Sequence, residues 1–149
     1  MKSKLLRLFC SLVMYDYNIR ILHWKVKGLD FGTKHLLMDD YHSQLNSFTD
    51  EIGEILMMTG ETDIPSFDKV LEYIKEDNDE EYIILEGDEY FSAEDVIGTA
   101  KMIFDHLIKI YRDIITNDNL PSDIISTLDD HVYWLRKESS YKLRSNLVK

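Results

Sequence analysis

The sequence predicts an all-α protein built as a four-helix bundle, and three observations favour this fold class. The chain has 149 residues, of which 44% are hydrophobic and 30% charged, a balance typical of a globular protein with its own core. It holds only two prolines and six glycines, so few residues would interrupt a helix. No stretch sustains the alternation of a half-buried strand. We expect one domain over residues 1–149.

The first predicted helix spans residues 4–27, where apolar residues recur every three or four positions along one helix face. The start resembles a secretion signal, with two lysines before apolar residues. Arg7, Asp16 and Arg20 interrupt it at helical spacing, so we expect it to stay in the mature protein. Gly28 ends the helix.

The second predicted helix spans residues 33–59 and has an apolar stripe of the same period. Residues 28–32 form a short turn before it, and Gly60 stops it. The first two helices therefore form an antiparallel hairpin.

A long connection separates this hairpin from the next one. It opens with a short helix that begins near Ser66, and it continues through an acidic run, residues 76–81, which we interpret as solvated. The apolar run YIIL, residues 82–85, is expected to cross the bundle as an ordered segment, with a short strand as the alternative.

The second hairpin consists of helices over residues 93–116 and 121–143. Ser92 and Asp95 resemble a capping box, and Pro121 is expected at the first helical position. Two hairpins joined by a long crossover that contains a short helix give the connectivity of a ferritin-like bundle.

Charge and cysteine usage limit the partners and the compartment. The net charge of −11 disfavours strong binding to nucleic acid and suits the attraction of cations. No apolar run is long enough to span a bilayer. The single Cys10 cannot form an internal disulfide, so we expect a buried thiol and a cytoplasmic protein.

The second helix carries four metal-ligand side chains on one face. At 100° per residue His35, Asp39, Asp50 and Glu54 fall within about 100° of one another. The i,i+4 spacing brings the members of each pair together. The two pairs, however, are separated by about 16 Å along the axis, so one helix cannot bring both to one ion. Gly53, on the same side, would let another helix approach closely.

A second copy of this helix, packed antiparallel about a two-fold axis, resolves the problem. It would set His35 and Asp39 of one chain opposite Asp50 and Glu54 of the other, giving two equivalent sites per dimer. His23 lies before the turn, at about the same position along the hairpin axis as His35. It would therefore bind the metal together with His35 and Asp39 of the same chain. Imidazole and carboxylate ligands suit Fe(II), and also Zn or Mn. Two ions bridged by a carboxylate can reduce oxygen or peroxide by two electrons.

The sequence resembles the Dps family, the mini-ferritins of the ferritin-like superfamily, over nearly its whole length. The matching residues and stretches are His23-Trp24, Gly28, Phe31, His35-x3-Asp39, Asp50-x3-Glu54, TGETDIP, FSAEDVI and HVYWLR.

This resemblance implies a dodecameric cage with ferroxidase sites at its two-fold interfaces. His23, His35 and Asp39 from one subunit, with Asp50 and Glu54 from its mate, would bind iron. Fe(II) would be oxidised by peroxide or oxygen, and Fe(III) would be stored as a ferric mineral that limits oxidative stress. Many family members also bind DNA without sequence specificity.

The chain departs from the family pattern in two places. Gly53-Glu54-Ile55 stands where the family has Ala-Glu-Arg, which removes an arginine that could pair between subunits. No lysine-rich extension precedes the first helix, although the basic stretch over residues 136–149 could make weak DNA contacts.

Two other interpretations are considered: a DNA-binding architectural protein with little ferroxidase activity, and a metal-free interaction bundle. We interpret Trp24 as core packing beside the site, with a redox-protective role implied by the resemblance. We interpret His42, His106 and His131 as structural or exposed.

Overall fold

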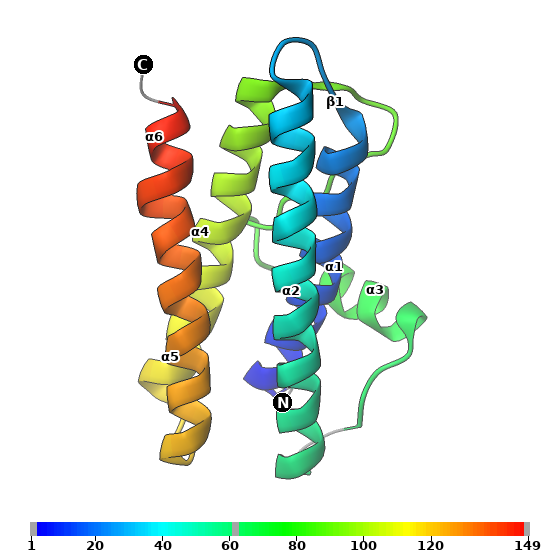
Figure 1. Cartoon of the computed structure of the whole chain (residues 1–149). Helices are drawn as coiled ribbons and strands as arrows, with labels where there is room; N and C mark the ends of the chain where they lie inside the picture. The colour runs from blue at the N-terminus through cyan, green and yellow to red at the C-terminus, as the bar shows by residue number, and fades with distance from the viewer. Residues whose placement is uncertain (1–2, 61–62, 148–149) are drawn as a thin grey trace.

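The computed structural model describes residues 3–60 and 63–147 and has the predicted all-α, ferritin-like four-helix bundle (Figure 1). Helices α1 and α2 run side by side as one hairpin, and α4 packs against α5 as the other. The helices are α1 (Lys4–Lys25), α2 (Phe31–Thr59), α3 (Phe67–Glu76), α4 (Ala93–Asn117), α5 (Ser122–Lys137), the π-helix η1 (Glu138–Leu143) and α6 (Arg144–Leu147).

The connection between α1 and α2 is as long as predicted but lies two residues earlier in the chain. Helix α1 ends at Lys25, two residues early, because β1 (Val26–Lys27) is extended and pairs in parallel with β2 (Phe91–Ser92). Gly28 has φ +90°, which favours glycine, and Asp30 is also left-handed, with φ 64°. Helix α2 therefore starts two residues before the predicted position.

The far end of α2 is as predicted. Gly60 is left-handed, with φ +66°, and its N–H donates to the carbonyl of Leu56 at 3.1 Å. A glycine at this position satisfies one of the last helical carbonyls without the strain that a side chain would add.

The crossover contains the short helix α3, capped by the side chain of Ser66. The YIIL run is not a strand. It is held along α1 by Asn18, whose amide donates to the carbonyl of Ile83 at 2.8 Å and accepts from the N–H of Leu85 at 3.2 Å. Our interpretation of the acidic run as merely solvated is wrong, because Arg7 pairs with Asp77 at 2.9 Å.

The second hairpin begins with the predicted cap, in which the Ser92 hydroxyl accepts from the N–H of Asp95 at 3.1 Å. Pro121 is the N-cap of α5, one position before the place we predicted. The predicted single helix over 121–143 is divided, since α5 passes into η1 and then α6.

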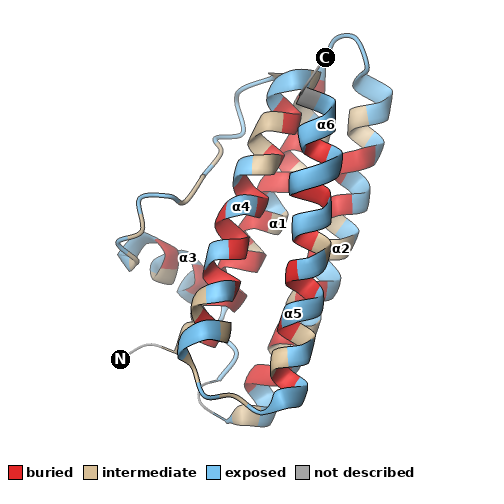
Figure 2. Cartoon of the chain, turned by 90° about the vertical axis from the view of Figure 1, so that its left-hand side faces the viewer, coloured by how far each residue is buried: buried red, intermediate tan, exposed pale blue. Residues whose placement is uncertain are grey.

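The four long helices turn their buried faces toward a common core, and their outer faces are exposed (Figure 2). Cys10 is buried in this core, as expected. Three large apolar side chains, Tyr17, Trp24 and Leu36, are nevertheless exposed on α1 and α2. Within the described residues, no helix is both long and apolar enough to cross a membrane.

Candidate metal centre

His23 and His35 meet at the tip of the α1–α2 hairpin, as the sequence predicts. Their rings are stacked, with centroids 3.7 Å apart and planes inclined by 21°. Phe31, from the first turn of α2, is also stacked against His35, with ring centroids 5.1 Å apart. The short turn after Gly28 therefore brings side chains twelve positions apart into direct contact.

The backbone fixes which nitrogen each histidine can offer. Nδ1 of His23 lies 2.7 Å from the carbonyl oxygen of His35, and Nδ1 of His35 lies 2.7 Å from the carbonyl oxygen of His23. A carbonyl only accepts, so each Nδ1 carries the proton and each neutral ring keeps its lone pair on Nε2. Histidines that bind metals are oriented in the same way, by a hydrogen bond from the other ring nitrogen.

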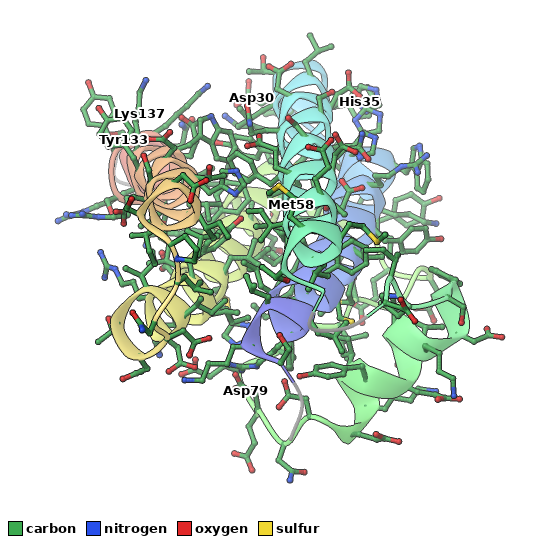
Figure 3. All side chains as sticks on the ribbon, turned by 90° about the horizontal axis from the view of Figure 1, so that it is seen from below. Asp30, His35, Met58, Asp79, Tyr133 and Lys137 are labelled. Carbon is green, nitrogen blue, oxygen red and sulfur yellow. The ribbon has the colours of Figure 1, made fainter. Side chains whose placement is uncertain are left out.

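The three carboxylates project from the exposed face of α2. Asp39, Asp50 and Glu54 are all exposed. Asp50 and Glu54 line an open groove of about 860 Å³, whose other walls come from Phe9 of α1, from neighbouring residues of α2 and from Ile64 in the connection that follows α2. Met58, seen at the near end of α2 in Figure 3, is part of that wall.

The protomer does not bring all five predicted ligands together. Among residues 3–60 and 63–147, no three of them place their ligand atoms within 4.8 Å of one another. His23 and His35 lie together at the hairpin tip, and Asp50 and Glu54 lie about four to five turns further along α2.

Two neighbouring residues differ from expectation. A Cβ added to Gly53 would lie 3.3 Å from the Phe9 ring, so its small size accommodates α1 of the same chain. Trp24 is 51% exposed, so in the protomer it is not core packing. Its ring lies 4.9 Å from the Arg20 guanidinium carbon and edge-on to Tyr17.

A separate group of ligand-type side chains was missed by the sequence interpretation. Asp79, Glu81 and His106 place their ligand atoms within 4.8 Å of one another. Figure 3, viewed along the bundle, shows Asp79 on a different side of the molecule from His35. No sequence spacing links residues of the crossover to α4, so only the fold could reveal this group.

This group is already neutralised by neighbouring side chains. His106 Nε2 lies 2.7 Å from Asp79, which also pairs with Arg7, and Lys109 pairs with Glu81 at 2.6 Å. Burial raises the pKa of Asp79, but its hydrogen bond from His106 and the charge of Arg7 outweigh this and lower it. We interpret these ion pairs as structural contacts that hold the crossover against α1 and α4. This fits the structural role expected for His106.

His131 and His42 are also engaged. His131 is buried, with Nδ1 2.7 Å from the Tyr111 hydroxyl. Its Nε2 lies 3.3 Å from Glu51, but the two groups are not aligned for a hydrogen bond. His42, half-buried between α1 and α2, has Nδ1 2.6 Å from Asp16. The burial of His131 fits the structural role expected for it.

Four basic side chains near the C-terminus are exposed: Arg136, Lys137, Lys142 and Arg144. Tyr133, Arg136, Lys137 and Ser140 line a small pocket on α5 and η1, and Tyr133 and Lys137 project outward in Figure 3.

Comparison with known proteins gives a consistent set of relatives, although no family model matches the chain. A DNA protection during starvation protein from Listeria innocua is 27% identical over 134 residues, covering 85% of this chain and 83% of that protein. The Dps structure from Listeria monocytogenes has a TM-score of 0.84 at 20% identity and covers 98% of this chain and 92% of its own.

Other Dps structures share the fold at lower identity. That of Mycobacterium smegmatis has a TM-score of 0.82 at 18% identity and covers 98% of this chain and 84% of its own.

Proposed function

Because this chain resembles the Dps family in sequence and has its fold, we propose that it oxidises Fe(II) and stores the ferric product inside a cage of identical subunits. The observation that carries the proposal is the pair of histidines whose Nδ1–H groups are fixed by carbonyls, since each Nε2 atom is left free to bind a metal ion of its own.

Each oxidation site would be assembled from two subunits. His23, His35 and Asp39 of one subunit would bind iron together with Asp50 and Glu54 of its mate, which the protomer holds too far away. Imidazole and carboxylate donors suit Fe(II). Two Fe(II) ions give one electron each, so one peroxide molecule takes up two electrons and two protons and leaves as two water molecules.

The surroundings support this chemistry. Phe31 stacks on His35 and keeps the imidazole pair in one orientation. The carboxylates are exposed on the free face of α2, where a second subunit could approach. The net charge of −11 favours the arrival of cations. Ile55 stands where the family has an arginine, and its side chain is buried in the core. Any contact that the arginine makes between subunits would have to come from other residues here.

Removing the carboxylate half of the site tests the proposal. In the double variant Asp50→Ala, Glu54→Ala, we expect rapid Fe(II) oxidation by peroxide, followed by stopped-flow absorbance, to fall by at least about 100-fold, because two charged ligands of each ion are lost. Both residues are exposed, so the variant should keep its fold by circular dichroism.

A matched control is available on α3. Asp68 and Glu72 are also an exposed Asp–Glu pair four residues apart, so Asp68→Ala, Glu72→Ala removes the same charge. This control should oxidise iron at the original rate. An unchanged rate in the Asp50, Glu54 variant would refute the assignment.

DNA binding is the second function considered. The exposed Tyr133, Arg136 and Lys137 supply cations and an aromatic ring, and the Listeria relative is named for DNA protection. The strongly acidic chain opposes such binding, so any complex should be weak and should disappear as salt rises. A gel shift with duplex DNA at low salt would detect it.

A further inference from the structure

The outer face of α2 is apolar near its two ends and polar between them. Leu36, near the first end, is 64% exposed, and Met57 and Met58, near the other, are 64% and 69% exposed. The two methionines also line the groove of about 860 Å³, so the apolar atoms at that end are contiguous, as on a surface that another molecule covers. The exposed side chains between the two ends include Asp39, Ser43, Asn46 and Asp50.

The groove is open because Gly53 has no side chain. A Cβ at this position would lie 3.3 Å from the Phe9 ring and 3.9 Å from Cδ1 of Ile64, so this ring and this methyl group form one side of the groove. The two methionines line its far end, and the carboxylates of Asp50 and Glu54 border it. The groove therefore fits a partner that brings an apolar side chain and, a short distance from it, ligands for a metal ion.

A second copy of this chain brings both groups at the required spacing. Leu36 precedes the proposed ligand Asp39 by three residues on the same helix, which is almost one turn. The proposed site sets Asp39 of one subunit opposite Asp50 of its mate on antiparallel helices. The residue three positions before Asp39 then lies level with the residue three positions after Asp50, so Leu36 lies at the level of Gly53.

The directions of the side chains bring the apolar groups of the two copies together. Helical side chains lean toward the N-terminus of their own helix. On antiparallel helices, Leu36 therefore leans toward Met57 of the mate, and Met57 leans back toward Leu36. Around the helix axis, Leu36 points between Met57 and Met58, about 60° from one and about 40° from the other. A two-fold rotation sets each flank of α2 against the same flank of the mate, so Leu36 meets the two methionines.

The centre of this arrangement lets the two helices approach closely. In the same register Ser43 of one copy lies level with Asn46 of the other, and neither residue has a large side chain. Leu36 lies about 13 Å from this centre along the helix axis. The helices should therefore cross at the shallow angle of about 20° that is common in helical bundles, since a steeper crossing would separate their ends.

We propose that Leu36 of each subunit packs against Met57 and Met58 of its mate, in the groove beside Gly53, and holds the two parts of the shared metal site in register. The contact forms twice in a two-fold pair, once at each end of the paired helices. The proposal rests on the proposed function, because the register is that of the shared site. It adds the occupant of the groove, a second copy of this chain, and the side chains that recognise it.

This contact stabilises an interface whose middle is acidic. Asp39, Asp50 and Glu54 of each subunit face the same residues of the mate, and before a metal ion binds these carboxylates repel one another. The apolar contacts at the two ends offset this repulsion, because they remove leucine and methionine surface from water.

Dilution of the metal-free protein, followed by sedimentation, measures the strength of the contact. In Leu36→Ser, the protein concentration at which the assembly dissociates should rise about 10- to 100-fold, because two leucines in each two-fold pair lose their apolar contact. Leu36→Met keeps an apolar side chain and should dissociate at the original concentration. Leu36 is exposed in the protomer, so both variants should keep the circular dichroism of the unaltered protein.

Leu71 provides the matched control. It is a leucine on α3 that is 40% exposed, so Leu71→Ser makes the same chemical change away from the outer face of α2. This variant should dissociate at the same concentration as the unaltered protein.

Paired cysteines test the register directly. In Leu36→Cys, Met57→Cys the two new thiols of one chain lie about 31 Å apart along α2, too far for a short bifunctional thiol reagent to join them. The reagent should instead join two chains into a product of twice the 17.6 kDa of one chain. In Leu71→Cys, Met57→Cys this product should not form.

The outcomes separate this contact from the proposed function. If Leu36→Ser stays assembled on dilution as the unaltered protein does, or if the paired cysteines join no chains, the contact is refuted. Should Asp50→Ala, Glu54→Ala still lose rapid iron oxidation in that case, the proposed function stands without it. Weaker assembly of Leu36→Ser, together with iron oxidation at the original rate in Asp50→Ala, Glu54→Ala, would support the contact and refute the proposed function.

Discussion

At the scale of single residues, the environment of each imidazole decides its role. The sequence contains five histidines, and spacing alone singled out His23 and His35. Their contact agrees with that prediction. The short turn between α1 and α2 places the two residues at the same position along the hairpin axis. His131 could not be interpreted in this way, since its burial depends on α2 and α4, which pack around it from other parts of the chain.

Burial of His131 should make stability depend on pH. Desolvation lowers its pKa below the ordinary value of 6.5, so at pH values just below 6.5 the unfolded chain binds a proton that the folded chain does not. The free energy of unfolding should therefore fall as the pH drops from 7.5 through 6.5 and recover as the pH rises again. Urea unfolding at pH 7.5 and 5.5 measures this change in the free energy of unfolding. The change should be smaller in His131→Gln than in the unaltered protein.

Tyr111→Phe is the control for this prediction. It removes the hydroxyl beside Nδ1 but keeps the imidazole buried, so the loss of stability at low pH should persist. Equal pH dependence in the unaltered protein and in His131→Gln would show that other groups cause it.

At the scale of elements, the crossover is fixed by charges that we expected to be solvated. Arg7 on α1 reaches Asp77 and Asp79, and Asp79 in turn accepts from His106 on α4. Periodicity identified the helices, because each contacts the core along one stripe. The crossover has no such period, so its path along α1 was not predictable from spacing.

Removing Arg7 should loosen the crossover. Arg7→Ala leaves two carboxylates without their shared cation, and we expect a loss of about 2 kcal/mol in the free energy of unfolding. The amides of Ile83 and Leu85, which donate to Tyr15 and Asn18, should exchange hydrogen faster. Hydrogen exchange measured by mass spectrometry checks this.

Lys69→Ala is the matched control. Both side chains of the Lys69–Glu72 pair are exposed, so the pair should contribute little to the free energy of unfolding. Unchanged exchange at Ile83 and Leu85 in Arg7→Ala would mean that the crossover is held by its apolar contacts.

At the scale of the whole molecule, the proposed oxidation site needs more than one chain. One variant lacks the histidine half (His23→Ala, His35→Ala) and the other lacks Asp50 and Glu54. Each alone should oxidise Fe(II) slowly. Unfolded together and reassembled, the two should regain part of the activity, because each mixed two-fold contact contains one complete site.

Stopped-flow oxidation rates of the mixture, compared with the two variants reassembled separately, give the measurement. Sedimentation should show that all three samples assemble well beyond the 17.6 kDa of one chain. Assembly without any recovery of rate would contradict a site shared between subunits.

The sequence by itself determined the helices, the hairpin that joins His23 to His35, and the separation of the two ligand pairs on α2. These are local properties, governed by the helical period and by the turn glycine. Only the tertiary structure decided which nitrogen each histidine offers, where the crossover lies, and that Asp16 orients His42. Those features depend on contacts between residues far apart in the chain, which no local spacing encodes.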